Sequence, residues 1–277
     1  MKRLLPLLVC CTCYSLSAQI TRSPLSSLYT GIGTYSRHFT DAFSGATNQA
    51  ALAAVEQPVA GVYGERRFLL AALSNYTAAL ALPVKSGGMG LALHYFGAGS
   101  FTNTQLGFGY GRRLSENAAI GAQINYNTMR VPGYGSAGTV NFELGTLWNI
   151  REKLHLGFHL YNPVGGRFGK EGAEKLASIY TAGAGYEASE HFLLSTVLVK
   201  EEDQPVVMQA GLQYVFAKQF LARAGMSSAG GSYVAGVGIK SKWWRVDAVT
   251  AWHVQLGFTP AILLLFDLKE KKEEARP

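Results

Sequence analysis

The stretch that decides the fold is "TVNFELGTLWNIREKLHLGFHLYNP", residues 139–163. Apolar side chains such as Phe142 and Leu156 fall at even positions, and polar ones such as Asn141 and His155 fall between them. A period of two excludes an amphipathic helix and predicts two β-strands. The charged "REK" between them is too short for a parallel crossover, so the strands are expected to form an antiparallel hairpin.

This alternation fits two kinds of β-protein. In a soluble sandwich, the apolar face packs against a second sheet. In an outer-membrane barrel, the apolar face contacts lipid and the polar face lines the lumen. The hairpin alone does not separate the two, so the rest of the sequence has to decide.

The N-terminus has the order of a secretory signal peptide. Two basic residues precede an apolar run, and Ala18 is a small residue at the expected cleavage point. We therefore predict that residues 1–18 are a cleaved signal and that the protein is exported through the inner membrane. Because Cys10, Cys11 and Cys13 all fall in this segment, the mature chain is expected to have no disulfide, thiolate metal site or cysteine nucleophile.

Composition agrees with an exported β-protein. Glycine supplies 32 of the 277 residues and charged residues only 16%, against about 25% in soluble domains. After the signal, no apolar run reaches the ~18 residues of a transmembrane helix. The net charge of +7 comes without a basic cluster interleaved with aromatic residues, so it does not indicate nucleic acid. It favours contact with outer-membrane lipid and lipopolysaccharide.

Apolar alternation recurs in blocks of roughly ten to fourteen residues, the length of a tilted membrane strand. These blocks place a barrel at residues 58–268, and the charged residues 269–277 are expected to form a periplasmic tail. The predicted strands are 58–67, 75–84, 87–97, 102–113, 117–130, 138–150, 153–162, 176–187, 190–200, 204–216, 219–228, 231–240, 242–253 and 256–268.

The connections between these blocks sort by length. Counted from the first strand, the even connections are short and polar, such as "REK", whereas the odd ones include "VPGYGSAG" and "NPVGGRFGKEGAEKL". Short periplasmic turns and longer extracellular loops are typical of bacterial outer-membrane barrels. A sandwich has no reason for such sorting. The sequence therefore predicts an all-β fold, a transmembrane antiparallel β-barrel of about 14 strands.

Residues 19–57 lack strand alternation. The stretch is rich in small residues, and Asn48 is predicted to cap a short helix over residues 49–56 that Pro58 ends. Low charge and small side chains suit close packing inside a lumen. We therefore predict that this stretch is an N-terminal hatch that plugs the barrel.

Four segments carry a resemblance to a known family. They are "SGATNQAALAAVE" (44–56), "VYGERRF" (62–68), "NYTAALALPVKSGGMGLALHYFG" (75–97) and "AVTAWHVQLGFTPAILLLFDL" (248–268). Together they resemble the FadL-like outer-membrane transporters and, within them, the PorV/PorQ-like branch of Bacteroidetes. Members usually carry Asn-Pro-Ala ahead of the first strand. This chain departs from that pattern in its hatch, with Asn48, Gln49 and Ala50.

The resemblance implies a fourteen-stranded barrel with a hatch, and one of two functions. The first, which we favour, is a porter of hydrophobic small molecules across the outer membrane. The alternative is an outer-membrane component of type IX protein secretion that transports no small ligand. The expected partner is accordingly either a hydrophobic ligand or a set of type IX secretion proteins.

The sequence predicts neither an enzyme nor a cofactor site. A hydrolase on a barrel wall needs a paired Ser and His. Ser195, His155, His159 and His253 are all expected to face inward, but no Gly-x-Ser-x-Gly motif is present. The strings "GFGYG" and "GYGSAG" imitate nucleotide loops, yet no helix is predicted after them. We interpret them as small residues that pack a narrow lumen.

A set of polar residues is predicted to line that lumen. In a barrel too narrow for an open channel, such groups pair with one another or with the hatch. Arg245 and Asp247, two residues apart on one face, are expected to form one such pair. The predicted lumen-lining residues are Gln105, Gln123, Asn125, Asn141, Glu143, His155, His159, Gln209, Arg223, Arg245 and Asp247.

Overall fold

The computed structural model describes residues 24–99, 101–168 and 174–268. The predicted signal peptide (1–18) and periplasmic tail (269–277) lie outside the described residues and stay predictions. Among the residues that are described, no helix is both long enough and apolar enough to cross a membrane.

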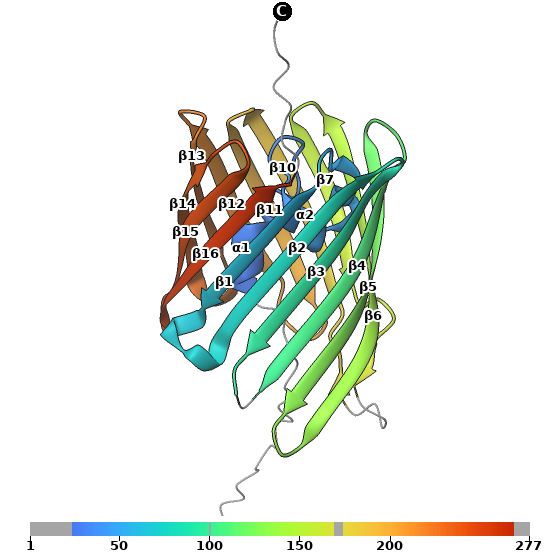
Figure 1. Ribbon diagram of the computed structural model, residues 1–277, viewed down its shortest axis with the longest axis vertical. Helices are drawn as coiled ribbons and strands as arrows, with labels where there is room; N and C mark the ends of the chain where they lie inside the picture. Colours follow the sequence, from blue (N-terminus) through green and yellow to red (C-terminus); the bar gives the residue numbers. More distant parts are fainter. Residues whose placement is uncertain (1–23, 100, 169–173, 269–277) are drawn as a thin grey trace, which may run out of the picture.

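Fourteen antiparallel strands form a closed barrel (Figure 1). Each strand pairs with its neighbour in the chain, and β1 pairs with β16 from Val59↔Asp267 to Glu65↔Ala261, which closes the sheet. The prediction of a fourteen-stranded barrel is confirmed. The strands are β1 (Val59–Arg66), β2 (Ser74–Val84), β3 (Gly87–Gly97), β4 (Thr102–Arg113), β5 (Ala118–Val131), β6 (Gly135–Arg151), β7 (Leu154–Tyr161), β10 (Ile179–Ser189), β11 (Phe192–Glu201), β12 (Val207–Phe216), β13 (Phe220–Ser227), β14 (Ser232–Lys240), β15 (Trp244–His253) and β16 (Gly257–Asp267).

The two faces of the wall follow the alternation in the sequence. In β6, Val140, Phe142 and Leu144 are 47%, 47% and 48% exposed on the outside, whereas Asn141 and Glu143 are 1% and 0% exposed on the inside. The hairpin register keeps this phase across the turn into β7. The outer surface is therefore apolar, and the polar side chains turn inward.

The two rims of the barrel differ. The short-turn rim, at the upper end in Figure 1, and the loop rim, at the lower end, are each defined by alternate connections. The short-turn rim consists of 85–86, 114–117, 152–153, 190–191, 217–219 and 241–243; the described residues of the loop rim are 67–73, 98–99, 101, 132–134, 162–168, 174–178, 202–206, 228–231 and 254–256.

One expected long loop is wrong. The stretch "VPGYGSAG" contributes only residues 132–134 to the connection, because β5 and β6 extend to Val131 and Gly135. Gly133 and Gly135 have φ values of 84° and 99°, a region that glycine enters without the steric cost of a Cβ. They allow a tight turn where a longer loop was predicted.

The long connection 162–178 has structure of its own. It contains a small ladder of β8 (Arg167–Phe168) and β9 (Glu174–Lys175), which the sequence analysis did not predict. Asn162, at φ 52°, donates from Nδ2 to the Leu176 carbonyl and accepts from the Gly166 amide. These hydrogen bonds hold the two ends of the connection together over the loop rim.

The N-terminal segment, residues 24–54, lies inside the barrel (Figure 1). It consists of α1 (Pro24–Gly31), α2 (Ala42–Thr47) and the 3₁₀ helix η1 (Gln49–Ala54). Asn48 caps η1 through its side chain, but the helix is 3₁₀ and ends at Ala54, shorter than predicted. The remaining short helices are η2 (Arg67–Leu69), η3 (Ala71–Leu73) and η4 (Ala229–Gly231), all at the loop rim.

Candidate functional site

The N-terminal segment packs against glycines on the inner wall. A Cβ placed on Gly183 would lie 2.1 Å from ring atoms of Tyr35, and one on Gly185 would lie 1.7 Å from the Tyr35 carbonyl oxygen. On the opposite side of the segment, a Cβ on Gly111 would lie 2.5 Å from the carbonyl oxygen of Gln49. The segment can approach the wall this closely only because these positions lack side chains.

Glu143 is the centre of the first polar cluster. Its carboxylate is fully buried and accepts a hydrogen bond from Gln49 Nε2 of the N-terminal segment at 2.7 Å. Four wall side chains also contact it. They are Asn125 at 2.8 Å, His159 at 2.8 Å, and Gln105 and Gln123 at 3.3 Å each. A buried carboxylate is costly unless it is hydrogen-bonded, so these donors fix the segment and the wall relative to each other.

Glu187 of β10 holds a second part of the segment. Its Oε1 accepts from Ser36 Oγ at 2.5 Å and from the His38 amide at 3.1 Å. Its Oε2 lies 2.6 Å from His38 Nδ1 and 3.6 Å from His155 Nε2. The turn between α1 and α2 is therefore attached to the wall by one carboxylate.

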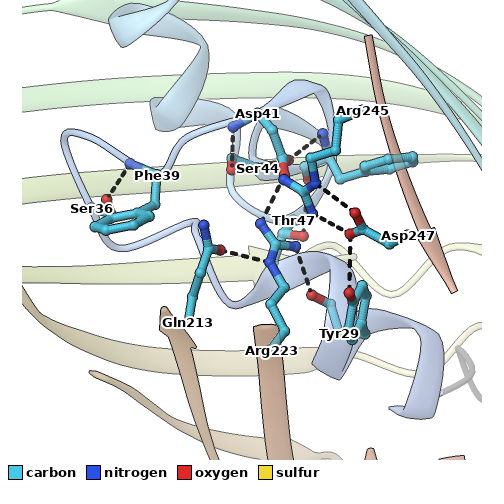
Figure 2. Close-up of polar contacts among 11 residues, drawn as sticks. Tyr29, Ser36, Phe39, Asp41, Ser44, Thr47, Gln213, Arg223, Arg245 and Asp247 are labelled. Atoms are coloured by element: carbon cyan, nitrogen blue, oxygen red, sulfur yellow. Dashed lines mark hydrogen bonds and ion pairs between the residues drawn. The ribbon is translucent and has the colours of Figure 1, made fainter. Parts of the chain in front are cut away.

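A charged cluster joins the segment to the other side of the barrel (Figure 2). Arg223 donates to Asp41 at 3.2 Å and to the Tyr29 carbonyl at 3.2 Å, both on the segment. Arg245 donates from Nε to Asp247 at 2.8 Å, and the Tyr29 hydroxyl donates to the same carboxylate at 3.0 Å. Two guanidinium groups and two carboxylates balance one another in charge.

In these clusters, the wall and the N-terminal segment depend on each other for hydrogen-bond and ion-pair partners. Removing one partner of a buried ion pair usually costs about 3–5 kcal/mol, because the other charge stays buried without compensation. Glu143, Glu187 and Asp247 each bind the N-terminal segment by hydrogen bonds. The segment is therefore held at three points of the wall. Removing it would leave three buried carboxylates without some of their hydrogen-bond partners.

A cavity of about 1100 Å³ lies between the segment and the loop rim. Its inner end is formed by Leu28, Ile32, Tyr35 and Phe43 of the N-terminal segment, and its lining also includes residues 204–206 of the loop rim. The lumen thus has two parts. We call the part occupied by the N-terminal segment the filled half and the part between the segment and the loop rim the cavity half.

The two sides of the cavity wall carry different mixtures of side chains. On neighbouring strands β2, β3 and β4, the inward residues Thr77, His94 and Gln105 stand side by side in register, and Asn75 and Asn103 also line this side. Across the barrel, strands β10–β12 are separated from β4 by β5, β6 and β7. Their lining residues combine the apolar Ile179, Val197, Val199 and Val207 with the polar Thr181, Ser195, Glu201 and Gln209.

The structure places all eleven predicted lumen-lining residues on the inner face, where each is buried. Five of them meet at Glu143, and Arg223, Arg245 and Asp247 meet in the charged cluster. Asn141 accepts from Asn127 at 2.6 Å, His155 contacts Asn149 and Glu187, and Gln209 lines the cavity. Of the predicted hatch residues, Gln49 binds Glu143, while Asn48 donates to wall carbonyls and accepts from the Ala50 amide.

Sequence reasoning missed several members of these clusters. Glu187 follows the outward Tyr186 in the alternation of β10, so its inward direction could have been read from the phase. Gln213, which accepts from Arg223 Nε at 2.6 Å, could have been found in the same way. Tyr29 and Asp41 belong to a segment without periodicity, and no local signal indicated their partners.

The groups weighed for hydrolysis are not assembled. In the described part of the chain, Ser195 makes no hydrogen bond to a histidine, and His155 and His159 are held by Glu187 and Glu143. His253 lies at the end of β15, where its ring packs against Phe68. Within the same residues, no group of three or more His, Cys, Asp or Glu is arranged to hold a metal ion.

Comparison with solved structures finds the same barrel. The chain is similar to CymD, a monoaromatic hydrocarbon channel, with a TM-score of 0.63, 13% identity, and coverage of 88% of this chain and 97% of that one. It is similar to a Pseudomonas aeruginosa FadL homologue, with a TM-score of 0.63, 12% identity, and coverage of 87% of this chain and 98% of that one. It is also similar to the Pseudomonas putida toluene transporter TodX, with a TM-score of 0.60, 10% identity, and coverage of 86% of this chain and 95% of that one. No family profile and no curated protein matches the sequence.

At these identities the likeness establishes a shared fold. One of the solved barrels that share this fold is a FadL homologue. The PorV/PorQ-like branch stays a prediction.

Proposed function

We propose that this protein is an outer-membrane channel for small hydrophobic molecules. The single observation that carries the proposal is the cavity of about 1100 Å³ between the N-terminal segment and the loop rim. Its volume is in the range of small-molecule sites, which are typically about 300–1,000 Å³ and mostly apolar. Solved barrels of the same fold include a monoaromatic hydrocarbon channel and a toluene transporter.

The membrane location is supported by the outer surface. Side chains such as Leu106, Phe108 and Ile124 are 47%, 51% and 46% exposed there. An apolar surface that surrounds a barrel is unfavourable in water and suits the hydrocarbon core of a bilayer. The short-turn rim is expected to face the periplasm and the loop rim the exterior, so that the cavity half receives molecules from outside.

The N-terminal segment acts as a hatch in this proposal. It occupies the filled half and is bound at Glu143, Glu187 and Asp247, so a molecule in the cavity half reaches the periplasm only after the segment or the wall moves. This arrangement separates a site that takes up hydrophobic molecules from a barrier that blocks polar solutes.

Uptake by intact cells tests the channel function. Cells of a Gram-negative host that produce the protein should take up radiolabelled naphthalene faster than cells without it. Val197→Trp places an indole in the cavity and should abolish most of the gain. The matched control Val140→Trp adds the same ring on the outer face, where Val140 is 47% exposed, and should leave uptake unchanged. Equal uptake with and without the protein would refute the proposal.

The alternative function, type IX secretion without small-ligand transport, predicts a partner-binding rim. No observation on the described residues favours it over the channel, so it stays an expectation from the sequence resemblance.

A further inference from the structure

The cavity lacks a fixed positive charge. Among the described residues that line it, none is Lys or Arg. The buried guanidinium groups of Arg223 and Arg245 lie outside the lining. Arg223 pairs with Asp41, and Arg245 pairs with Asp41 and Asp247 in the charged cluster. Their charge is therefore already matched where they are.

Two histidines and one glutamate are among the groups that line the cavity. His159 Nε2 lies 2.8 Å from the Glu143 carboxylate, so a negative group already faces it. His94 Nδ1 lies 3.0 Å from the Thr77 hydroxyl. Glu201, which is 8% exposed, contributes a carboxyl group to the lining. Among the described residues, a bound molecule therefore meets no Lys or Arg side chain.

The remaining polar side chains of the cavity are neutral hydrogen-bonding groups. Asn75, Thr77, Asn103 and Gln105 lie on β2–β4, and others such as Thr181, Ser195 and Gln209 lie on β10–β12. The valines of β11 and β12 and the ring of Phe43 supply apolar surface between them. A hydroxyl or carbonyl group can be hydrogen-bonded by one of these polar side chains while an apolar body contacts the apolar surface.

From this lining, and on the basis of the proposed channel function, we infer that the cavity selects neutral amphipathic molecules and discriminates against carboxylates such as fatty-acid anions. A carboxylate would lose its hydration on entry and meet no cation, which is unfavourable for an ionised group. A neutral alcohol or ketone loses less hydration free energy on entry, and it regains hydrogen bonds from amide and hydroxyl side chains. The substrate class is therefore set by the absence of a counter-ion as much as by the apolar surface.

Competition binding tests this selectivity. The full-length protein in zwitterionic lipid nanodiscs is titrated with a fluorescent naphthylamine probe, and n-octanol, octylammonium and octanoate compete at about pH 8, where the carboxylic acid is ionised. Nanodiscs without protein give the background from lipid. We expect n-octanol to bind at least about tenfold more tightly than octanoate. Because the two ions have the same chain and opposite charge, octylammonium should also bind more tightly than octanoate.

A charge substitution gives the second arm. Asn103→Lys places an ammonium group at the cavity wall close to the loop rim and should raise octanoate affinity by about tenfold while changing n-octanol little. The matched control Asn103→Leu should not raise it. Octanoate binding as tight as octylammonium in the unsubstituted protein would overturn the inference, as would an unchanged octanoate affinity in folded Asn103→Lys.

The outcomes separate the two proposals. If neither the probe nor any competitor binds above the background of nanodiscs without protein, the channel function itself fails. If n-octanol and octanoate both bind, and octanoate binds at least as tightly as octylammonium, the channel stands and only the selectivity fails.

Discussion

The two halves of the lumen use the same strands with different inward side chains. Along β4, Asn103 and Gln105 face the cavity half, while Gly107, Gly109 and Gly111 continue the same inward face into the filled half. The outward residues beside these glycines, Leu106 and Phe108, are large. A change in side-chain size along one inward face therefore marks the level at which another part of the chain packs against the wall.

Strand β10 repeats the pattern. Ile179 and Thr181 line the cavity, and Gly183 and Gly185 contact Tyr35 in the filled half, followed by Glu187. The difference teaches that inward polar and inward glycine positions have distinct roles here. Glycines admit the N-terminal segment, and buried carboxylates hold it. The following predictions test this contrast, starting with the largest expected effect.

Deleting residues 28–57 should abolish the difference between the halves. Each wall strand keeps its backbone hydrogen bonds to two neighbouring strands, so the barrel should still fold. Water would then fill the space left beside the inward glycines. We expect the deletion variant to conduct ions in a planar bilayer and the intact protein to be nearly silent. Equal conductance of the two forms would contradict the hatch assignment.

Asp247→Ala should strongly destabilise the filled half. The substitution removes the carboxylate that pairs with Arg245 and accepts from Tyr29. Arg245 then keeps only the more distant Asp41, at 3.7 Å. Removing one partner of a buried ion pair costs about 3–5 kcal/mol, which denaturant unfolding in lipid vesicles can measure as a loss of unfolding free energy. The control is Ser195→Ala in the cavity half, where a change within about 1 kcal/mol is expected. Similar losses at both positions would remove the energetic contrast between the halves.

The glycine contrast can be tested by adding carbon atoms to each half. Gly183→Ala places a Cβ 2.1 Å from the Tyr35 ring, so the ring or the segment must move, and overpacking of this kind costs about 1–3 kcal/mol. Val197→Leu adds a methylene group in the cavity half, where there is room, and should change the unfolding free energy by less than about 0.5 kcal/mol. A tolerated alanine at Gly183 would mean that the segment packs loosely.

Much of this architecture was accessible from the sequence. The period-two alternation fixes which face of each strand is apolar, so the fourteen strands and the inward direction of residues such as Glu143 and Asp247 could be predicted. Asn48 could be recognised as a helix cap because its residue type and position are local signals. In each case the information lies within a few neighbouring residues.

The partners of these residues were not accessible in the same way. Whether Gln49 meets Glu143 depends on the stagger between strands and on the level at which the segment enters, which are properties of the closed barrel. Tyr29 and Asp41 belong to a segment without periodicity, and Glu187 was missed although its phase pointed inward. The prediction of a long loop before β6 was wrong for a different reason, because two positive-φ glycines allow a shorter turn.

The smallest effect is expected at the loop rim, outside both halves. Lys175 forms an ion pair with Glu202, and its hydrogen bond holds the pKa of the Glu202 carboxyl below the usual value. A carboxyl whose pKa is lowered by folding contributes stability above its unfolded pKa and loses it as pH falls through the folded value. Because this pair is solvent-exposed, that contribution is small.

Lys175→Ala should raise the pKa of Glu202 toward the ordinary glutamate range, as NMR titration of its carboxyl carbon can measure, without a measurable change in unfolding free energy at neutral pH. Lys200→Ala, at an exposed lysine of β11 that bonds a backbone carbonyl, should leave the Glu202 titration unchanged. A loss of stability in Lys175→Ala as large as in Asp247→Ala would mean that the loop rim, and not only the filled half, holds the barrel together.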